Sequence, residues 1–127
     1  MAKAFVINKQ VPMTLLDIIR FQINMHCFTN KIRLSPAQQD CLALLGMYGD
    51  INMSDFCEQV VLEEVFGNVQ TTRNFITKSV KEGLVIRSGM GNKVVSLNPN
   101  LGILNSGTIL LNLKVYHHEA NQSKNAN

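Results

Sequence analysis

The hydrophobic pattern is clearest between Asn68 and Leu97. Read with a period of 3.6, one helical face carries Val69, Thr72, Phe75, Ile76, Ser79 and Val80. The opposite face carries Gln70, Asn74, Thr77, Lys78 and Lys81, with Arg73 at its edge. Gly83 ends the helix after Glu82, because glycine adopts the left-handed cap conformation at little cost. Two short alternating runs follow, 84–87 and 93–97, around the glycine-containing turn 88–92, which predicts a β-hairpin.

Two more amphipathic helices precede this stretch. The first covers 36–48, with Ser35 as N-cap, Pro36 in its first turn and Gly49 at its end. A short extended piece at 50–52 then leads to a helix over 53–66, whose N-cap is Asn52 or Ser54. Leu62 falls off the apolar face of that helix, so we expect it to bend, restart or be buried on two sides.

The flanking segments are less clearly patterned. Ala4–Ile7 can form a short strand, and 14–28 fits a helix capped by Thr14, although 19–26 also alternates as a strand does. The alternation over 108–116 predicts a C-terminal strand, and the polar segment 117–127 predicts a disordered tail. We therefore expect four parts: an N-terminal extension at 1–33 that is a candidate for dimerisation, a domain at 34–99, a strand at 100–116 packed on that domain or on a partner, and the tail.

Three helices followed by a hairpin predict an α+β, mainly α, winged helix-turn-helix with a two-stranded wing. The run LSPAQQDCLALLGMYGDINMSDFCEQ with TTRNFITKSVKEGLVIRSGMGNKVVSLNP resembles the winged helix of MarR-type regulators. It is also similar to the winged-helix replication initiators of plasmids and phages, whose wing often runs into an Asn-Pro such as Asn98-Pro99. The segment 62–68 is longer than the roughly three- to four-residue turn that usually joins the two helices of the motif.

Positive charge is concentrated in the same stretch. Between Asn68 and Lys93 there are five cations and one carboxylate, a formal charge of +4, whereas the whole chain carries +3. Phosphate binding needs cations, and base edges need forked donors and acceptors. We expect helix 69–82 to read double-stranded DNA and the wing 84–97 to contact phosphate, through Gln70, Arg73, Asn74, Thr77, Lys78, Lys81, Arg87, Ser88, Asn92 and Lys93.

The resemblance implies a transcriptional regulator or a replication accessory factor, and so few phosphate contacts would require a homodimer for useful affinity. An alternative comes from the acidic segment 50–64, which has five carboxylates and no Lys or Arg. Like charge repels phosphate, so that face can instead serve a protein partner. The chain would then be an interaction module or a structural assembly protein of a phage or plasmid.

Composition adds mainly exclusions. The sequence shows no phosphate-binding glycine loop, nucleophile elbow or other enzymatic motif, and we expect no enzyme and no cofactor. Three cysteines at 27, 41 and 57 have no CxxC spacing, and His117-His118 lacks further ligands, so we expect reduced core thiols and no metal. No apolar run reaches the roughly 20 residues of a membrane span, and no signal peptide is evident, which favours a cytoplasmic location.

Overall fold

The computed structural model describes residues 2–6, 12–107 and 112–116. Two units can be distinguished: one holds Met13–Ser106, and the other holds Met1–Pro12 with Gly107–Asn127. In the second unit, strand β1 (Ala2–Val6) pairs antiparallel with β5 (Asn112–Tyr116). The predicted C-terminal strand is thus present over 112–116 and has β1 as its neighbour, whereas 108–111 and the predicted tail 117–127 lie outside the described residues.

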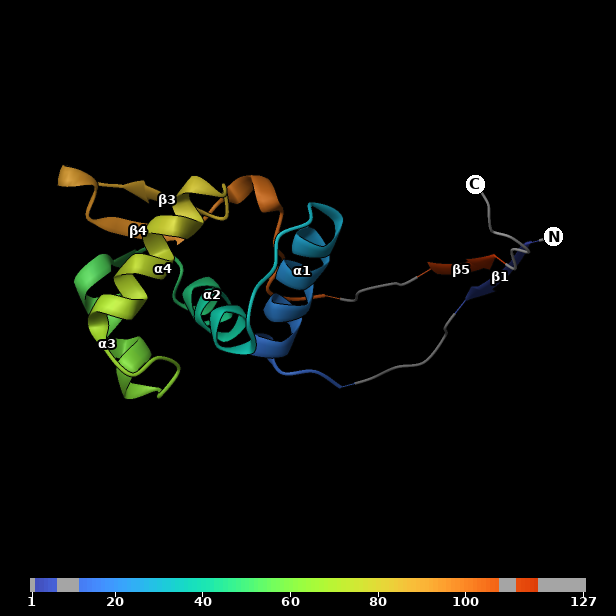
Figure 1. The fold of residues 1–127 in the computed structure, drawn as a ribbon, viewed down its shortest axis with the longest axis horizontal. Helices are drawn as coiled ribbons and strands as arrows, with labels where there is room; N and C mark the ends of the chain where they lie inside the picture. The colour runs from blue at the N-terminus through green and yellow to red at the C-terminus, as the bar shows by residue number, and fades with distance from the viewer. Residues whose placement is uncertain (1, 7–11, 108–111, 117–127) are drawn as a thin grey trace, which may run out of the picture. The chain divides into compact units, whose positions relative to one another are not determined.

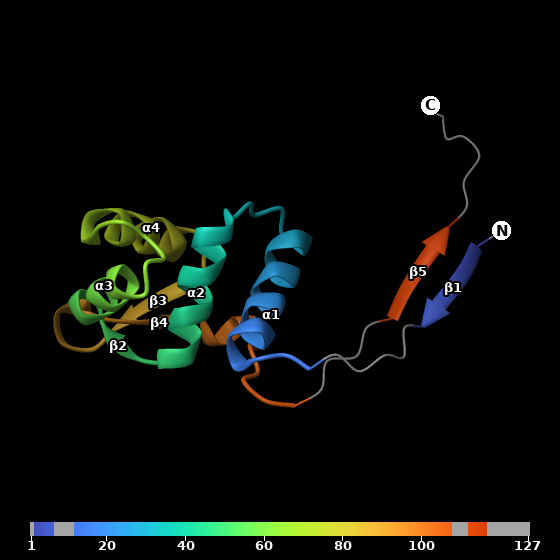
Figure 2. The ribbon, with the colours of Figure 1, turned by 90° about the horizontal axis from the view of Figure 1, so that it is seen from below.

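The unit Met13–Ser106 contains four α-helices, three short strands and two 3-10 turns (Figures 1 and 2). The α-helices are α1 (Leu15–Thr29), α2 (Pro36–Tyr48), α3 (Met53–Leu62) and α4 (Val69–Lys81). The strands are β2 (Ile51–Asn52), β3 (Val85–Ser88) and β4 (Val94–Leu97), and the 3-10 turns are η1 (Met90–Asn92) and η2 (Pro99–Leu101). Helix α1, which we expected within an N-terminal extension at 1–33, belongs to this unit.

The ambiguous segment 14–28 is a helix. The hydroxyl of Thr14 accepts a hydrogen bond from the Asp17 backbone N–H at 3.1 Å, which satisfies one of the free donors at the helix start. Ile19, Ile23 and Cys27 are buried, whereas Phe21 is only half-buried and Met25 is exposed, although a strand would place all five on one face. The strand-like alternation over 19–26 is therefore incidental to the fold.

Helix α2 lies in the middle of the unit, between α1 and the pair α3 and α4 (Figures 1 and 2). Its start is a reciprocal capping box: the Gln38 N–H donates to the Ser35 hydroxyl at 3.2 Å, and the Ser35 N–H donates to the Gln38 side-chain oxygen at 2.9 Å. Cys41, Leu42 and Leu45 are completely buried. One continuous core therefore joins all four helices and the sheet.

Helix α3 ends at Leu62, earlier than predicted, and residues 63–68 connect it to α4. The end is a Schellman motif, because Val65 N–H bonds the Val60 carbonyl at 3.1 Å and Glu64 N–H bonds the Val61 carbonyl at 3.0 Å. Leu62 is 72% exposed, in agreement with its predicted position outside the apolar face of the helix. Phe66 returns to the core, where its ring meets that of Phe75 edge-on.

The predicted two-stranded wing is present, and β2 extends it to an antiparallel sheet in the order β2-β4-β3. Asn52 pairs with Val94, and the Met53 N–H donates to the Lys93 carbonyl at 2.7 Å, so the start of α3 is fixed to the wing. At the tip, Gly89 has a φ of +77°, and a Cβ there would lie 2.9 Å from a Val94 methyl. The arrangement of α2, α3, α4 and this sheet is that of a winged helix-turn-helix.

Candidate nucleic-acid interface

The outward face of α4 is a polar stripe. At intervals of four, three and four, it carries Gln70, Asn74, Thr77 and Lys81, all exposed. The opposite face is buried through Thr72, Phe75, Ile76 and Ser79. Of the residues assigned to the buried face from the sequence, Val69 is 36% exposed, because as the first residue of the helix it lies at the rim of the core.

Two amides within the stripe are already paired. The side-chain nitrogen of Gln70 donates to the side-chain oxygen of Asn74 at 2.9 Å. This bond joins both side chains across one turn of the helix and, among the described residues, leaves the Gln70 side-chain oxygen and the Asn74 NH₂ without another partner. The pair therefore presents an acceptor next to a donor, which is the combination that an adenine edge requires.

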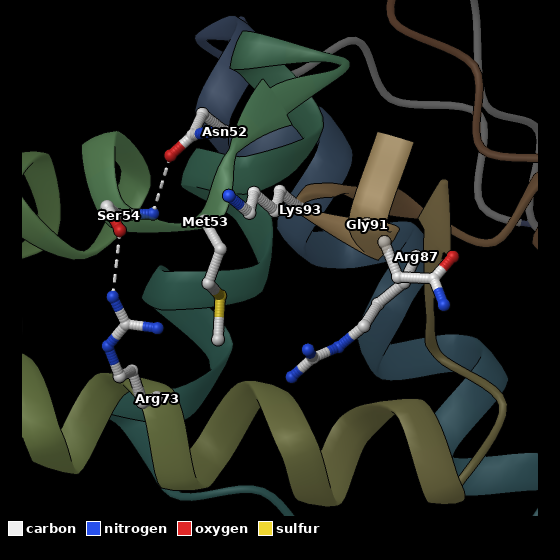
Figure 3. A pocket seen from close by; sticks show the side chains of 8 residues that line it. Asn52, Met53, Ser54, Arg73, Arg87, Gly91 and Lys93 are labelled. Atoms are coloured by element: carbon white, nitrogen blue, oxygen red, sulfur yellow. Dashed lines mark hydrogen bonds between the residues drawn. The ribbon is translucent and has the colours of Figure 1, made fainter. Parts of the chain in front are cut away.

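Arg73 leaves the stripe and reaches α3. Its guanidinium donates to the Ser54 hydroxyl at 2.8 Å, and the side chain is half-buried (Figure 3). Ser54 is held in turn by the N-cap Asn52, whose side-chain oxygen accepts from the Ser54 N–H at 2.9 Å. The expected base-reading residue is thus fixed at the start of α3, beside the stripe.

Arg87 and Lys93 approach the same place from the wing. Arg87 lies on β3, and its guanidinium donates to the Thr77 hydroxyl at 3.3 Å, which ties the wing to the stripe. Lys93 immediately precedes β4, and its carbonyl is bonded to Met53. In Figure 3 the guanidinium groups of Arg73 and Arg87 lie over α4, with Met53 between them.

These side chains enclose a hollow of about 300 Å³. Its lining is Asn52, Met53, Ser54, Arg73, Arg87, Gly91, Asn92 and Lys93, and we call it the basic pocket. Three of its residues are cations and none is a carboxylate, and within the described part of the chain none of the three forms an ion pair. Such a pocket favours an anion, and its guanidinium forks suit phosphate oxygens.

The structure brings together only some of the predicted site residues. Arg73, Arg87, Asn92 and Lys93 meet in the basic pocket, and Asn92 takes a left-handed φ of +54° at the wing tip. Ser88 is half-buried at the end of β3 and does not line the pocket. Lys78 is exposed on the flank of α4 away from Arg73.

Sequence reasoning missed the contribution of α3 and its preceding strand. Asn52, Met53, Ser54 and Gly91 line the pocket without having been predicted as site residues. The available signal was the pair of competing N-cap candidates: Asn52 takes the cap, which leaves the Ser54 hydroxyl free to accept from Arg73. That hydrogen bond joins residues 19 positions apart, so it cannot be predicted from a local sequence pattern.

The acidic segment keeps its charges at the surface. Asp50, Asp55, Glu58, Glu63 and Glu64 are all exposed. Glu63 and Glu64 follow the last turn of α3, whereas the basic pocket lies at the first turn. Two of the five carboxylates therefore lie at the opposite end of α3 from the pocket, whereas Asp55 is in the first turn.

All three cysteines are free and buried. Burial raises the pKa of the Cys41 thiol to about 12, with a smaller contribution from the neighbouring Cys57. Burial also raises the pKa of Cys57, an effect that Arg73 partly opposes, and the pKa of Cys27, to which the nearby Glu82 adds.

Within the described ranges no group of three or more His, Cys, Asp or Glu side chains is placed to hold a metal ion, and His117-His118 lies outside them. None of the helices described here has the length and apolarity needed to cross a membrane.

Comparison with known proteins supports the fold assignment. No protein-family model and no curated protein matches the sequence. Among solved structures, a zinc uptake regulator determined in complex with zinc and DNA matches with a TM-score of 0.56 and 19% sequence identity. The match covers 67% of this chain and 57% of the regulator, so this chain spans little more than half of that protein's length. The likeness shows that the winged-helix fold is shared.

Proposed function

We propose that this protein binds double-stranded DNA, with α4 in the major groove and the wing along the phosphate backbone. The observation that carries the proposal is the basic pocket, in which Arg73 from α4, Arg87 from β3 and Lys93 beside β4 converge next to an exposed polar stripe. A backbone phosphate seated there would be held by guanidinium and ammonium donors from α4 and from the wing at once.

The roles within the interface follow from geometry. Gln70 and Asn74 stand outward from α4 and are the candidates for base-edge contacts, with Thr77 and Lys81 farther along the same stripe. Arg73, which the sequence favoured as a guanine reader, is better suited to phosphate because its guanidinium is bonded to Ser54. Lys78 and the wing residues Ser88 and Asn92 would add phosphate or sugar contacts at the edges.

The solved neighbour adds support of a different kind. That zinc uptake regulator was solved in complex with zinc and DNA, and it shares the winged-helix fold with this chain. We infer that this chain acts as a regulator of transcription. The alternative within the same class is a replication accessory role, because the sequence is also similar to winged-helix replication initiators. Because five cations give few phosphate contacts, we propose that it binds as a homodimer.

The test is the salt dependence of binding to a random duplex, measured by fluorescence anisotropy. If all five cations between Asn68 and Lys93 neutralise phosphate, log K should fall against log salt with a slope of roughly −4.5 for each bound protomer. Lys93→Gln and Arg87→Gln should each reduce the slope by about 0.9 per protomer. Arg33→Gln is the matched control, since Arg33 is an exposed cation on the connection between α1 and α2.

Sequence reading needs a separate measurement. After selection of a preferred duplex, Asn74→Ala should reduce the preference over random DNA by about 10- to 100-fold and leave the salt slope unchanged, because an amide contacts bases without displacing counterions. No binding at tens of micromolar protein in low salt, or equal effects of the Arg33 and Lys93 substitutions, would reject the proposal.

A protein-interaction or assembly module is the second candidate. It is favoured by the five exposed carboxylates of 50–64, for which the described part of the chain supplies no ion-pair partner. A stable complex with a basic protein that is lost on Glu58→Gln, and is unaffected by Lys93→Gln, would support this candidate. A chain that binds DNA but captures no such partner would reject it.

A further inference from the structure

Helix α1 is apolar on two opposite sides, and only one of them faces the core. Ile19, Ile23 and Cys27 are buried against the rest of the unit. On the opposite side lie Ile18, Phe21, Met25 and Phe28, which we call the outer seam of α1. A surface helix normally places polar residues on that side.

The outer seam is accessible within its unit. The side chain of Phe28 is 79% exposed and that of Met25 is 43% exposed. Ile18 and Phe21 are half-buried, yet among the described residues neither is packed against the hydrophobic core cluster. Figures 1 and 2 show α1 at the edge of the unit, with α2 on its inner side.

One flank of the seam is already occupied by the chain itself. The backbone of Leu104 is bonded twice to Gln22: its N–H donates to the Gln22 side-chain oxygen at 2.8 Å, and its carbonyl accepts from the Gln22 amide. The segment that follows the wing therefore lies beside α1 at Gln22. The seam is the apolar surface that remains.

We propose that the outer seam binds the same seam of a second copy of this chain, with the two α1 helices antiparallel. The seam residues are spaced by three, four and three positions, which is the spacing of the a and d positions of a coiled coil. Antiparallel pairing would place Ile18 against the partner's Phe28, and Phe21 against the partner's Met25. The same contacts recur on both sides of the two-fold axis, as a closed dimer requires.

Charge selects the antiparallel arrangement. Asp17 lies beside one end of the seam, and Lys31 follows its other end. Antiparallel pairing brings Asp17 near the partner's Lys31 twice, whereas parallel pairing would bring like charges together at both ends. Asp17 already lies 3.6 Å from Arg20 in its own helix, but that guanidinium is closer to Asp40, at 2.7 Å, so Asp17 shares it.

The proposed dimer leaves the basic pocket free. Helix α2 separates α1 from α4 in both views, so pairing through α1 would not cover the outward stripe (Figures 1 and 2). The inference does not rest on DNA binding, and its test uses neither DNA nor the pocket residues. Since the seam from Ile18 to Phe28 is only about 15 Å long, we expect a dimer that dissociates on dilution into the low micromolar range.

The experiment is sedimentation equilibrium of the full chain over a range of concentrations, with circular dichroism to verify folding. The wild type should approach twice its 14.2 kDa mass at high concentration. Met25→Glu should remain a monomer, because it places a charge in the seam. Met90→Glu is the matched control: Met90 is 94% exposed on the wing, and its substitution should leave the dimer unchanged.

A charge exchange tests the orientation and does not depend on a disruptive substitution. Asp17→Lys and Lys31→Asp should each weaken the dimer by about tenfold, since each removes two symmetry-related ion pairs. The double variant should restore the wild-type affinity. The proposal is overturned if the wild type is monomeric throughout, if Met25→Glu still dimerises, or if the double variant is no tighter than the singles. The proposal would also be overturned if the protein were monomeric and Phe21→Glu lowered its free energy of unfolding. The seam would then be covered by the chain itself.

Discussion

Replacing Glu64 by glycine should stabilise the protein. Glu64 follows the end of α3 in the left-handed region, with a φ of +61°, and its backbone N–H bonds the Val61 carbonyl. This conformation costs a residue with a Cβ about 1–2 kcal/mol, and glycine avoids that cost. Glycine also gives the unfolded chain more freedom, worth about 0.5–1 kcal/mol in the other direction. The expected net gain in the free energy of unfolding is therefore about 0.5–1 kcal/mol.

The chain supplies a matched reverse substitution. Helix α4 ends in the same motif, in which Leu84 N–H bonds the Ser79 carbonyl and Gly83 takes a φ of +78°. A Cβ at Gly83 would meet no atom within 4 Å, so Gly83→Ala tests backbone conformation alone. It should cost about 1 kcal/mol, the reverse of the gain at Glu64.

The assay is urea unfolding of both variants beside Glu63→Gly. Glu63 carries the same charge one residue earlier, but with a φ of −80°. Glycine there should bring no gain and should cost up to about 1 kcal/mol. If Glu64→Gly and Glu63→Gly changed stability equally, the effect would come from charge, and the conformational explanation would be refuted.

Three further predictions concern the core, the thiols and the cap. Gly46→Ala should lower the free energy of unfolding by about 1–2 kcal/mol in urea, because its Cβ would lie 2.8 Å from methyl groups of both Ile19 and Leu97; an unchanged midpoint would contradict this packing. The Cys41 pKa is raised from 9.0 to about 12, so the unfolded state loses the proton first and stability falls between pH 9 and pH 12, by about 1.4 kcal/mol per pH unit. That fall should be smaller in Cys41→Ala when both proteins are unfolded at several pH values, and an identical pH dependence would contradict it. Asn52→Ala should lower the free energy of unfolding by about 1 kcal/mol and weaken DNA binding, because Ser54 loses its bond to the cap residue. If the variant were destabilised but bound DNA as tightly as the wild type, the cap would not contribute to the basic pocket.

Local pattern was sufficient for most of the helices and the hairpin. Ser35-Pro36 and Gly83 are explicit start and stop signals, and the structure uses both. The end of α3 could not be located in the same way, since Glu64 occupies a position at which glycine is the usual signal. The extended piece at 50–52 was predicted, but its pairing with β4 was not, because β4 lies more than 40 residues later in the sequence.

The candidate site was only partly predictable for a related reason. The excess of cations in α4 and the wing is visible in the sequence, and the exposed stripe follows from helical periodicity. The basic pocket depends on Ser54 reaching Arg73 and on the Met53 bond to Lys93, which are tertiary contacts. Sequence alone therefore indicated the positive charge, but it did not indicate the basic pocket that the charged side chains line.

The most direct test of the central claim is a map of amide chemical-shift changes as a short duplex is added to labelled protein. We predict that the changes concentrate at 52–54, along the α4 stripe and at 87–93, and that they diminish with added salt. The amides of the outer seam of α1 should show no chemical-shift change when the duplex is added. Shifts concentrated on the acidic segment or on α1, with the basic pocket silent, would contradict the assignment of α4 and the wing as the DNA-binding surface.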